Sequence, residues 1–147
     1  MKRIFNTNES NATAIIRVVL GLILFPHGAQ KMLGWFGGYG FNGTMGFLTG
    51  AAGLPWIIAF LVIAIEFFGA IALIFGFATR IVAVGIISLF TGIVLTSHYA
   101  NGFFMNWAGN QKGEGYEYHL LIIGMAIALL VSGAGKWSVD YALQKKK

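Results

Sequence analysis

Four long apolar stretches alternate with glycine-rich or charged segments along the 147-residue chain. A helix needs about 20 residues to cross a bilayer core of roughly 30 Å. Runs such as IIAFLVIAI and LLIIGMAIALLV lack the period-two alternation of a barrel strand. Because lipid offers the backbone no hydrogen bonds, such stretches must be helices. The pattern therefore predicts an all-α integral membrane protein, a four-helix bundle in a single domain, with spans at residues 12–33, 54–77, 79–99 and 116–135.

The connections between these spans are unequal. Almost nothing separates the second span from the third at Ala78–Thr79, which predicts a tight helical hairpin. Residues 34–53 and 100–115 are longer connections, and both are rich in glycine and aromatic residues. Tryptophan and tyrosine favour the membrane interface. We therefore expect these two segments to form an aromatic belt, a cap over the mouth of the bundle, or both.

Basic residues predict the orientation of the chain. Cytoplasmic loops of membrane proteins carry an excess of lysine and arginine. If the N-terminus is inside, seven basic residues lie on the inner side and two on the outer side, Lys31 and Lys112. We therefore expect a multi-pass protein of the cell membrane with both termini in the cytoplasm. The inner seven are Lys2, Arg3, Arg80, Lys136, Lys145, Lys146 and Lys147.

The composition narrows the class of function. The chain is 57% hydrophobic and 10% charged, whereas soluble domains are about 25% charged, so a soluble globular domain and a disordered chain are both excluded. It has no cysteine, which excludes thiol nucleophiles and disulfide exchange. A redox function would need a borrowed cofactor such as a quinone, a haem or a flavin. The basic ends flank apolar spans, which indicates contact with anionic lipid and not with nucleic acid.

Seven ionisable residues lie within or at the ends of the predicted spans. Each costs about 2.5–3.5 kcal/mol on insertion scales, and such residues usually face the protein interior. Three of them fall within an arc of about 80° on the first span. Gly21 and Gly28 border that stripe, and small residues let helices approach closely. The seven are Arg17, His27, Lys31, Glu66, His98, Glu117 and His119.

Depth along the helices divides these residues into two groups. Glu66 lies about 18 Å from the outer start of its helix, and Arg17 about 8 Å from the inner end of its own. We therefore expect a buried Arg17–Glu66 ion pair, either structural or functional. A second group lies within about 10 Å of the outer ends and predicts a polar pocket. It comprises His27, Lys31, His98 and Glu117, while His119 is expected to point away.

This pocket supplies the candidate chemistry. His27, His98 and Glu117 are the candidate catalytic residues, because histidine and glutamate carry protons. Lys31 is a candidate ligand-binding residue, although a lysine at that depth also reaches the interface without any ligand. Trp35 and Trp107 are expected to cover the ligand. His27, His98 and Glu117 come from three helices without HxxxH or ExxH spacing, so we predict no metal site.

A series of motifs covers almost all of residues 12–141. They are Arg17-x-x-Leu20-Gly21, Phe25-Pro26-His27-Gly28-x-Gln30-Lys31 followed by GWFGGYG, Glu66, Gly76 through Arg80, His98, Glu117 and GAGKWSVD at residues 133–140. The order of these motifs resembles that of the DoxX family. The resemblance implies a four-helix membrane protein, often described as an oxidoreductase, and some members are subunits of a thiosulfate:quinone oxidoreductase. The matching positions add Gln30 to the candidate ligand-binding residues.

Three functions fit these observations. The first is a quinone-linked membrane oxidoreductase or a subunit of one, in which His27 and Lys31 hydrogen-bond to the ring carbonyls while Glu117 or His98 exchanges protons with the outside. The second is a small-solute or proton transporter with an Arg17–Glu66 gate. The third is an accessory subunit that docks a redox partner subunit or a second copy of the chain through small-residue stripes.

Overall fold

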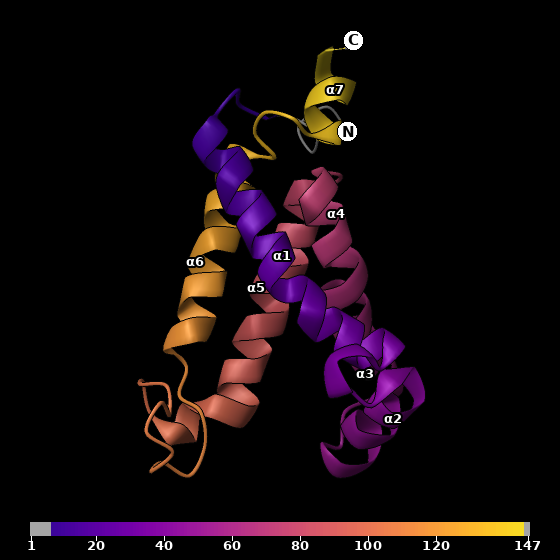
Figure 1. Ribbon diagram of the computed structural model, residues 1–147, viewed down its shortest axis with the longest axis vertical. Coiled ribbons are helices and arrows are strands. Elements are labelled where there is room, and N and C mark those ends of the chain that lie inside the picture. The colour runs from indigo at the N-terminus through magenta and orange to yellow at the C-terminus, as the bar shows by residue number, and fades with distance from the viewer. Residues whose placement is uncertain (1–6, 146–147) are drawn as a thin grey trace.

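The computed structural model describes residues 7–145, and no strand occurs in that range (Figure 1). The basic residues Lys2, Arg3, Lys146 and Lys147, which contribute to the predicted orientation, lie outside the described residues. The described chain forms four long helical rods. They are α1 (Asn11–Leu33); α3 (Trp56–Ala64) continued by η3 (Ile65–Gly69) and α4 (Ala70–Phe75); α5 (Thr79–Ile93) continued by η4 (Val94–His98) and η5 (Tyr99–Asn101); and α6 (Glu117–Ser132).

Three of these rods are long and apolar enough to cross a membrane. They cover Asn11–Leu33, Trp56–Phe75 and Thr79–Asn101, close to the first three predicted spans. Helix α6 has 16 residues and is therefore about 24 Å long. It ends three residues before the predicted limit of 135, because Gly133 (φ 82°) and Gly135 (φ 75°) adopt conformations that do not continue a helix.

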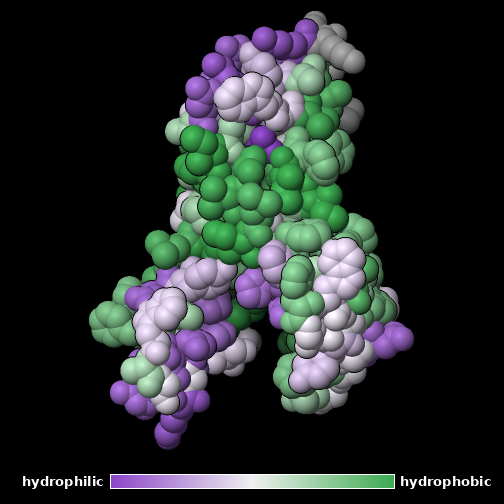
Figure 2. Space-filling view, viewed as in Figure 1, coloured by the Kyte–Doolittle hydropathy of each residue, from purple (hydrophilic) through white to green (hydrophobic). Residues whose placement is uncertain are grey.

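The rods pack around a core of aliphatic side chains. Helix α5 packs along α6, and α1 packs along α4. In Figure 2 a hydrophobic band crosses the middle of the molecule, with more polar surface toward both ends. This distribution suits a protein whose middle lies in lipid. The buried core includes Leu20, Leu24, Leu73, Ile86, Phe90, Ile122 and Leu129.

Two glycines bring α1 very close to the second rod. A Cβ added at Gly28 would lie 2.5 Å from the Glu66 carbonyl oxygen, and one added at Gly21 would lie 2.9 Å from the Ala70 carbonyl oxygen. Only hydrogen fits at either position. The expectation that the Gly21 and Gly28 stripe allows close helix approach is therefore confirmed.

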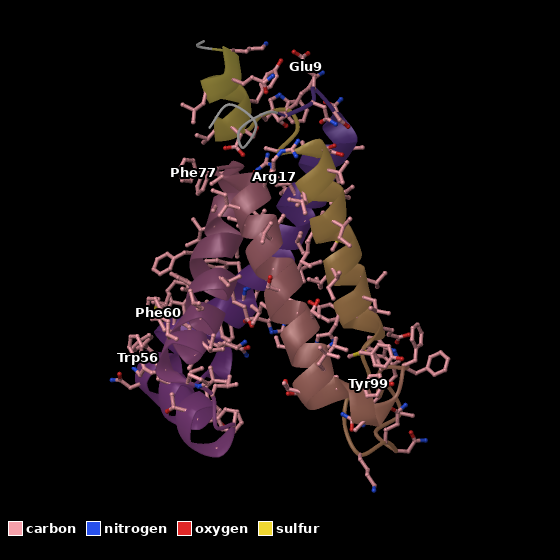
Figure 3. All side chains as sticks on the ribbon, turned by 180° about the vertical axis from the view of Figure 1, so that it is seen from behind. Glu9, Arg17, Trp56, Phe60, Phe77 and Tyr99 are labelled. Atoms are coloured by element: carbon pink, nitrogen blue, oxygen red, sulfur yellow. The ribbon has the colours of Figure 1, made fainter. Side chains whose placement is uncertain are left out.

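The described ends of the chain lie together at one end of the molecule, the terminal end, formed by residues 7–10 and 133–145 (Figure 1). Residues 34–53 and 100–115 form the opposite loop end, on two separate arms. Seen from behind in Figure 3, Trp56 and Phe60 lie on one arm and Tyr99 on the other. The aromatic cap considered from the sequence does not close over the bundle.

The reason is that residues 34–53 are helical and already packed. This segment contains η1 (Trp35–Gly37), α2 (Gly40–Gly46) and η2 (Phe47–Ala51). Helix α2 contacts α1 and α3, and Met45 of α2 joins Ala59 and Ile63 of α3 in a small core of its own. The segment is thus committed to its own arm.

A buried polar network closes the terminal end. The Arg17 guanidinium donates hydrogen bonds to four backbone carbonyls: Leu73 (2.5 Å), Ile74 (2.6 Å), Ala134 (2.9 Å) and Trp137 (3.2 Å). Leu73 and Ile74 lie in the last turn of α4, where carbonyls lack partners within the helix. Figure 3 shows Arg17 near this end of the bundle. The predicted Arg17–Glu66 pair is wrong, because the arginine extends to these carbonyls while Glu66 lies nearer the loop end.

Asp140 complements Arg17 on the other side of the hairpin. Its carboxylate accepts hydrogen bonds from the backbone N–H groups of Ala78 (2.8 Å) and Thr79 (2.9 Å), at the start of α5. A negative charge is favourable at a helix N-terminus and a positive charge at a C-terminus. The hairpin between α4 and α5 is therefore stabilised at both of its helix ends by residues distant in sequence.

Replacing Asp140 by asparagine is expected to lower the free energy of unfolding by about 1–2 kcal/mol, because the amide can accept only one of the two charge-assisted hydrogen bonds. Circular dichroism during unfolding in mixed micelles measures this. Glu9→Gln, at an exposed carboxylate of the same end, is the control and should change stability by less than about 0.5 kcal/mol. Equal losses in the two variants would contradict the capping role.

Candidate functional site

A cavity of about 330 Å³ lies toward the loop end, and all four rods contribute to it. Figure 2 shows hydrophilic surface gathered in the hollow between the two arms. The cavity combines cationic, acidic and imidazole groups with apolar side chains. Its lining residues are His27, Lys31, Glu66, Phe90, Ile93, His98, Met105, Glu114, Tyr118 and His119.

An ion pair forms one wall of this cavity. Lys31 Nζ lies 2.5 Å from Glu66 Oε2, and the Lys31 and Glu66 side chains are 28% and 5% exposed. A buried carboxylate needs such a partner, because an unpaired charge in a low-dielectric environment is costly. The ammonium has three donors, so Lys31 can bind Glu66 and still donate to a ligand. His27 lies one helical turn before Lys31 and is exposed.

Two of the cavity residues lie in π-helical turns. Glu66 belongs to η3 and His98 ends η4, and both segments are π-helix. Such turns are rare and frequently occur at functional sites. A π turn adds a residue to the helical repeat and so changes which side chains face the interior. Both turns therefore affect how their polar residues are presented to the cavity.

The opposite wall carries two histidines in contact, with their rings tilted by 41°. The His98 and His119 ring centroids are 4.2 Å apart, and Phe90 packs on His119 at 5.7 Å. His98 Nδ1 lies 2.8 Å from the Glu114 carbonyl oxygen. Because a carbonyl only accepts hydrogen bonds, Nδ1 of His98 is the donor, and the loop fixes the orientation of this ring.

His119 is buried, which corrects the expectation that it points away. The buried residues of α6 are His119, Ile122, Ala126 and Leu129. Small residues favour close helix packing, which would turn the face with Gly124 inward. Gly124 nevertheless has no atom within 4 Å of an added Cβ. The 119-122-126-129 spacing was a signal in the sequence, but the small residues of α6 suggested the other face.

The remaining predicted site residues lie outside the cavity. Glu117 Oε1 accepts a hydrogen bond from the Met105 N–H (3.0 Å) and so anchors segment 100–115. Gln30 donates to the Phe36 carbonyl (3.2 Å) and lines a neighbouring hollow that also touches Lys31. Trp35 and Trp107 are 53% and 89% exposed, and neither lines the cavity.

The structure therefore brings His27, Lys31, Glu66 and His98 together, and it adds residues that sequence reasoning missed. Among residues 7–145, no group of three or more His, Asp or Glu side chains is arranged to hold a metal ion. Lys31 can donate hydrogen bonds, and histidines can donate and accept them. Apolar walls with a few placed polar groups are typical of small-molecule sites. The additional lining residues are Phe90, Ile93, Met105, Glu114, Tyr118 and His119.

Fold and cavity together define a helical membrane protein with a polar cavity toward its loop end. The family model described as DoxX matches residues 12–99, and the chain belongs to the DoxX family. That match includes the cavity residues of the first three rods.

Three similar proteins agree with this assignment. The chain is 34% identical over 124 residues to the protein named "Putative oxidoreductase CatD" of Bacillus subtilis, covering 84% of this chain and 82% of the relative. It is 35% identical over 139 residues to "Inner membrane protein YqjF" of Escherichia coli, covering 94% and 96%. It is also 27% identical over 130 residues to "Inner membrane protein YphA" of E. coli, covering 86% of each chain. No solved structure matches the chain.

Proposed function

We propose that this protein is a membrane oxidoreductase, or a subunit of one, that binds a quinone-like molecule in the cavity between the two arms. The observation that carries the proposal is the meeting of the Lys31–Glu66 pair and His27 with Phe90, Ile93 and the two contacting histidines in one cavity. A quinone ring is apolar and carries two carbonyl acceptors, which matches this mixture of walls and donors. A relative named as an oxidoreductase adds support.

In this proposal four helices cross the membrane, and both termini face the cytoplasm. The described chain ends lie together at one end (Figure 1), which an even number of crossings requires. Basic residues are concentrated near both ends of the sequence, as expected for cytoplasmic segments. The cavity then opens on the outer side. Helix α6, about 24 Å long, would make the fourth crossing.

Each polar group has a distinct task in the proposed site. Lys31 donates a hydrogen bond to a ring oxygen, and Glu66 compensates its charge. His27, on the same face of α1, is the second donor on that wall. His98 is half-exposed and lies beside the exposed loop residue Glu114, so in this proposal it exchanges protons with the outer solution. Thiol chemistry is excluded by the absence of cysteine, and electrons would come from a partner subunit.

The proposed function is tested by titrating the protein in lipid nanodiscs with duroquinone, a benzoquinone without an isoprenoid tail, and measuring binding by calorimetry. Lys31→Met is expected to weaken binding at least about tenfold, because it removes the charged donor. Lys112→Met, at an exposed lysine of segment 100–115, is the control and should bind like the wild type. His27→Leu provides a second variant that leaves the Lys31–Glu66 pair intact.

Two outcomes would overturn the proposal: no saturable binding to the wild type, or equal affinity in Lys31→Met, His27→Leu and Lys112→Met. The transporter alternative has lost its main support, because Arg17 and Glu66 do not form the gate on which it depended. The accessory-subunit alternative predicts a stoichiometric partner on purification from native membranes, together with no quinone binding.

A further inference from the structure

One polar atom in the cavity wall has no partner. His119 is 7% exposed, and its Nδ1 atom is buried without a hydrogen bond among the described residues. Buried polar groups are almost always hydrogen-bonded, so each exception needs an explanation. The atom belongs to a residue that lines the cavity, and a bound molecule is one such explanation.

The His119 ring is held in place by its neighbours. It contacts the tilted rings of His98 (4.2 Å between centroids) and Phe90 (5.7 Å) and meets Tyr118 edge to face (5.8 Å). His98 is itself tied to the Glu114 carbonyl. Packing alone would be served equally well by phenylalanine at this position. An imidazole that its neighbours hold in place, and whose Nδ1 atom has no partner, can bind a ligand with little further ordering.

His119 and Lys31 reach the cavity from different sides. Lys31 comes from the last turns of α1, which run toward one arm in Figure 1, and His119 from the first turn of α6, which adjoins the other. Both residues line the same cavity of about 330 Å³. Two hydrogen-bonding groups on facing walls suit a ring that carries an oxygen on each of two opposite edges.

We propose that His119 is a ligand-binding residue whose imidazole ring hydrogen-bonds to the second oxygen of a molecule whose first oxygen is bound by Lys31. The inference rests on the proposed function and names the second contact of the same site. Histidine can donate to a carbonyl or accept from a hydroxyl, so the contact serves the oxidised and the reduced ring alike. The site thereby selects rings with two oxygens over rings with one.

The test compares two ligands that differ by one oxygen, tetramethylhydroquinone and tetramethylphenol, by titration calorimetry in nanodiscs under argon. The wild type is expected to bind the two-oxygen ligand about tenfold more tightly, about 1.4 kcal/mol. In His119→Phe, which keeps an aromatic ring and removes both nitrogens, the affinity ratio should fall to within about twofold. Lys112→Met, at an exposed lysine that does not line the cavity, should leave the ratio near tenfold.

The outcomes separate the inference from the proposed function. If the wild type binds both ligands with Lys31-dependent affinity but His119→Phe keeps the tenfold ratio, the inference is wrong and the proposed function stands. If the wild type binds neither, the proposed function is wrong and the inference fails with it. Size-exclusion chromatography checks folding, and His119→Gln, whose amide keeps a donor and an acceptor, should retain a ratio well above that of His119→Phe.

Discussion

Replacing Gly28 by alanine is expected to destabilise the helical bundle by about 3 kcal/mol, the upper part of the range for overpacking. The added Cβ would lie 2.5 Å from both the Glu66 carbonyl oxygen and the Phe67 Cα. Both atoms belong to backbone, so no side-chain rotation relieves the contact. Helix α1 and the second rod must move apart, which removes packing along their whole interface.

A matched control exists on α6. Gly124 has no atom within 4 Å of an added Cβ, so Gly124→Ala should be neutral or stabilise the protein by up to about 1 kcal/mol, because alanine is the better helix former. Unfolding in mixed micelles, followed by circular dichroism, measures both variants. If Gly28→Ala were as stable as Gly124→Ala, the close approach of α1 to Glu66 would be wrong.

The same substitution should also affect the cavity. Gly28 directly follows His27, and it touches the backbone of Glu66. Separating these two helices would lengthen the 2.5 Å contact between Lys31 and Glu66. We therefore expect any folded fraction of Gly28→Ala to bind duroquinone more weakly than Gly124→Ala does.

The long helices could be predicted from the sequence because hydrophobic length in a membrane protein is an almost sufficient signal. The first three predicted spans agree with Asn11–Leu33, Trp56–Phe75 and Thr79–Asn101 to within a few residues. The fourth was overextended, since the apolar character continues past Ser132 while the glycines that follow end the helix. Residues 34–53 were expected to be a loop because glycines disfavour helices. Helix α2 forms there because it packs against α1 and α3, which the sequence pattern does not show.

The site could be predicted only in part, because an angular count of 100° per residue assumes a regular α-helix. It placed His27 and Lys31 correctly on regular α1. The π turns around Glu66 and His98 change that repeat, so the count could not show which partners these residues meet. Glu114 comes from an irregular segment whose position no periodicity describes. For α6, the small residues indicated the wrong face, so His119 was expected to point away although it is buried.

Partner assignment also failed for a physical reason. Depth alone made Arg17 and Glu66 an attractive pair, but a buried guanidinium can be satisfied by carbonyls as well as by a carboxylate. The carbonyls at the end of α4 and in the chain after α6 are close to Arg17 only once the tertiary fold brings them together. Lys31 was expected either to bind a ligand or to reach the interface, and its ion pair with Glu66 was not predicted.

Replacing Arg17 by methionine is expected to lower the free energy of unfolding by about 3–5 kcal/mol, as when one partner of a buried charged network is removed. Carbonyls of two segments, the last turn of α4 and the chain after α6, would lose the hydrogen bonds that Arg17 donates. The buried Asp140 carboxylate, which interacts with the Arg17 charge, would lose that compensation. Methionine preserves most of the side-chain volume, so the loss reports hydrogen bonding and charge rather than a cavity.

Two further variants separate those causes. Arg17→Lys keeps the charge but lacks the planar fork that reaches several carbonyls, so it should lose about half as much stability as Arg17→Met. Lys136→Met, at a half-exposed cation of the same end, should change stability by less than about 0.5 kcal/mol. Denaturant unfolding in mixed micelles measures all three. An Arg17→Met protein as stable as Lys136→Met would mean that the terminal end is held by the apolar packing of α1 and α4 alone, and that its buried polar network contributes nothing net to the fold.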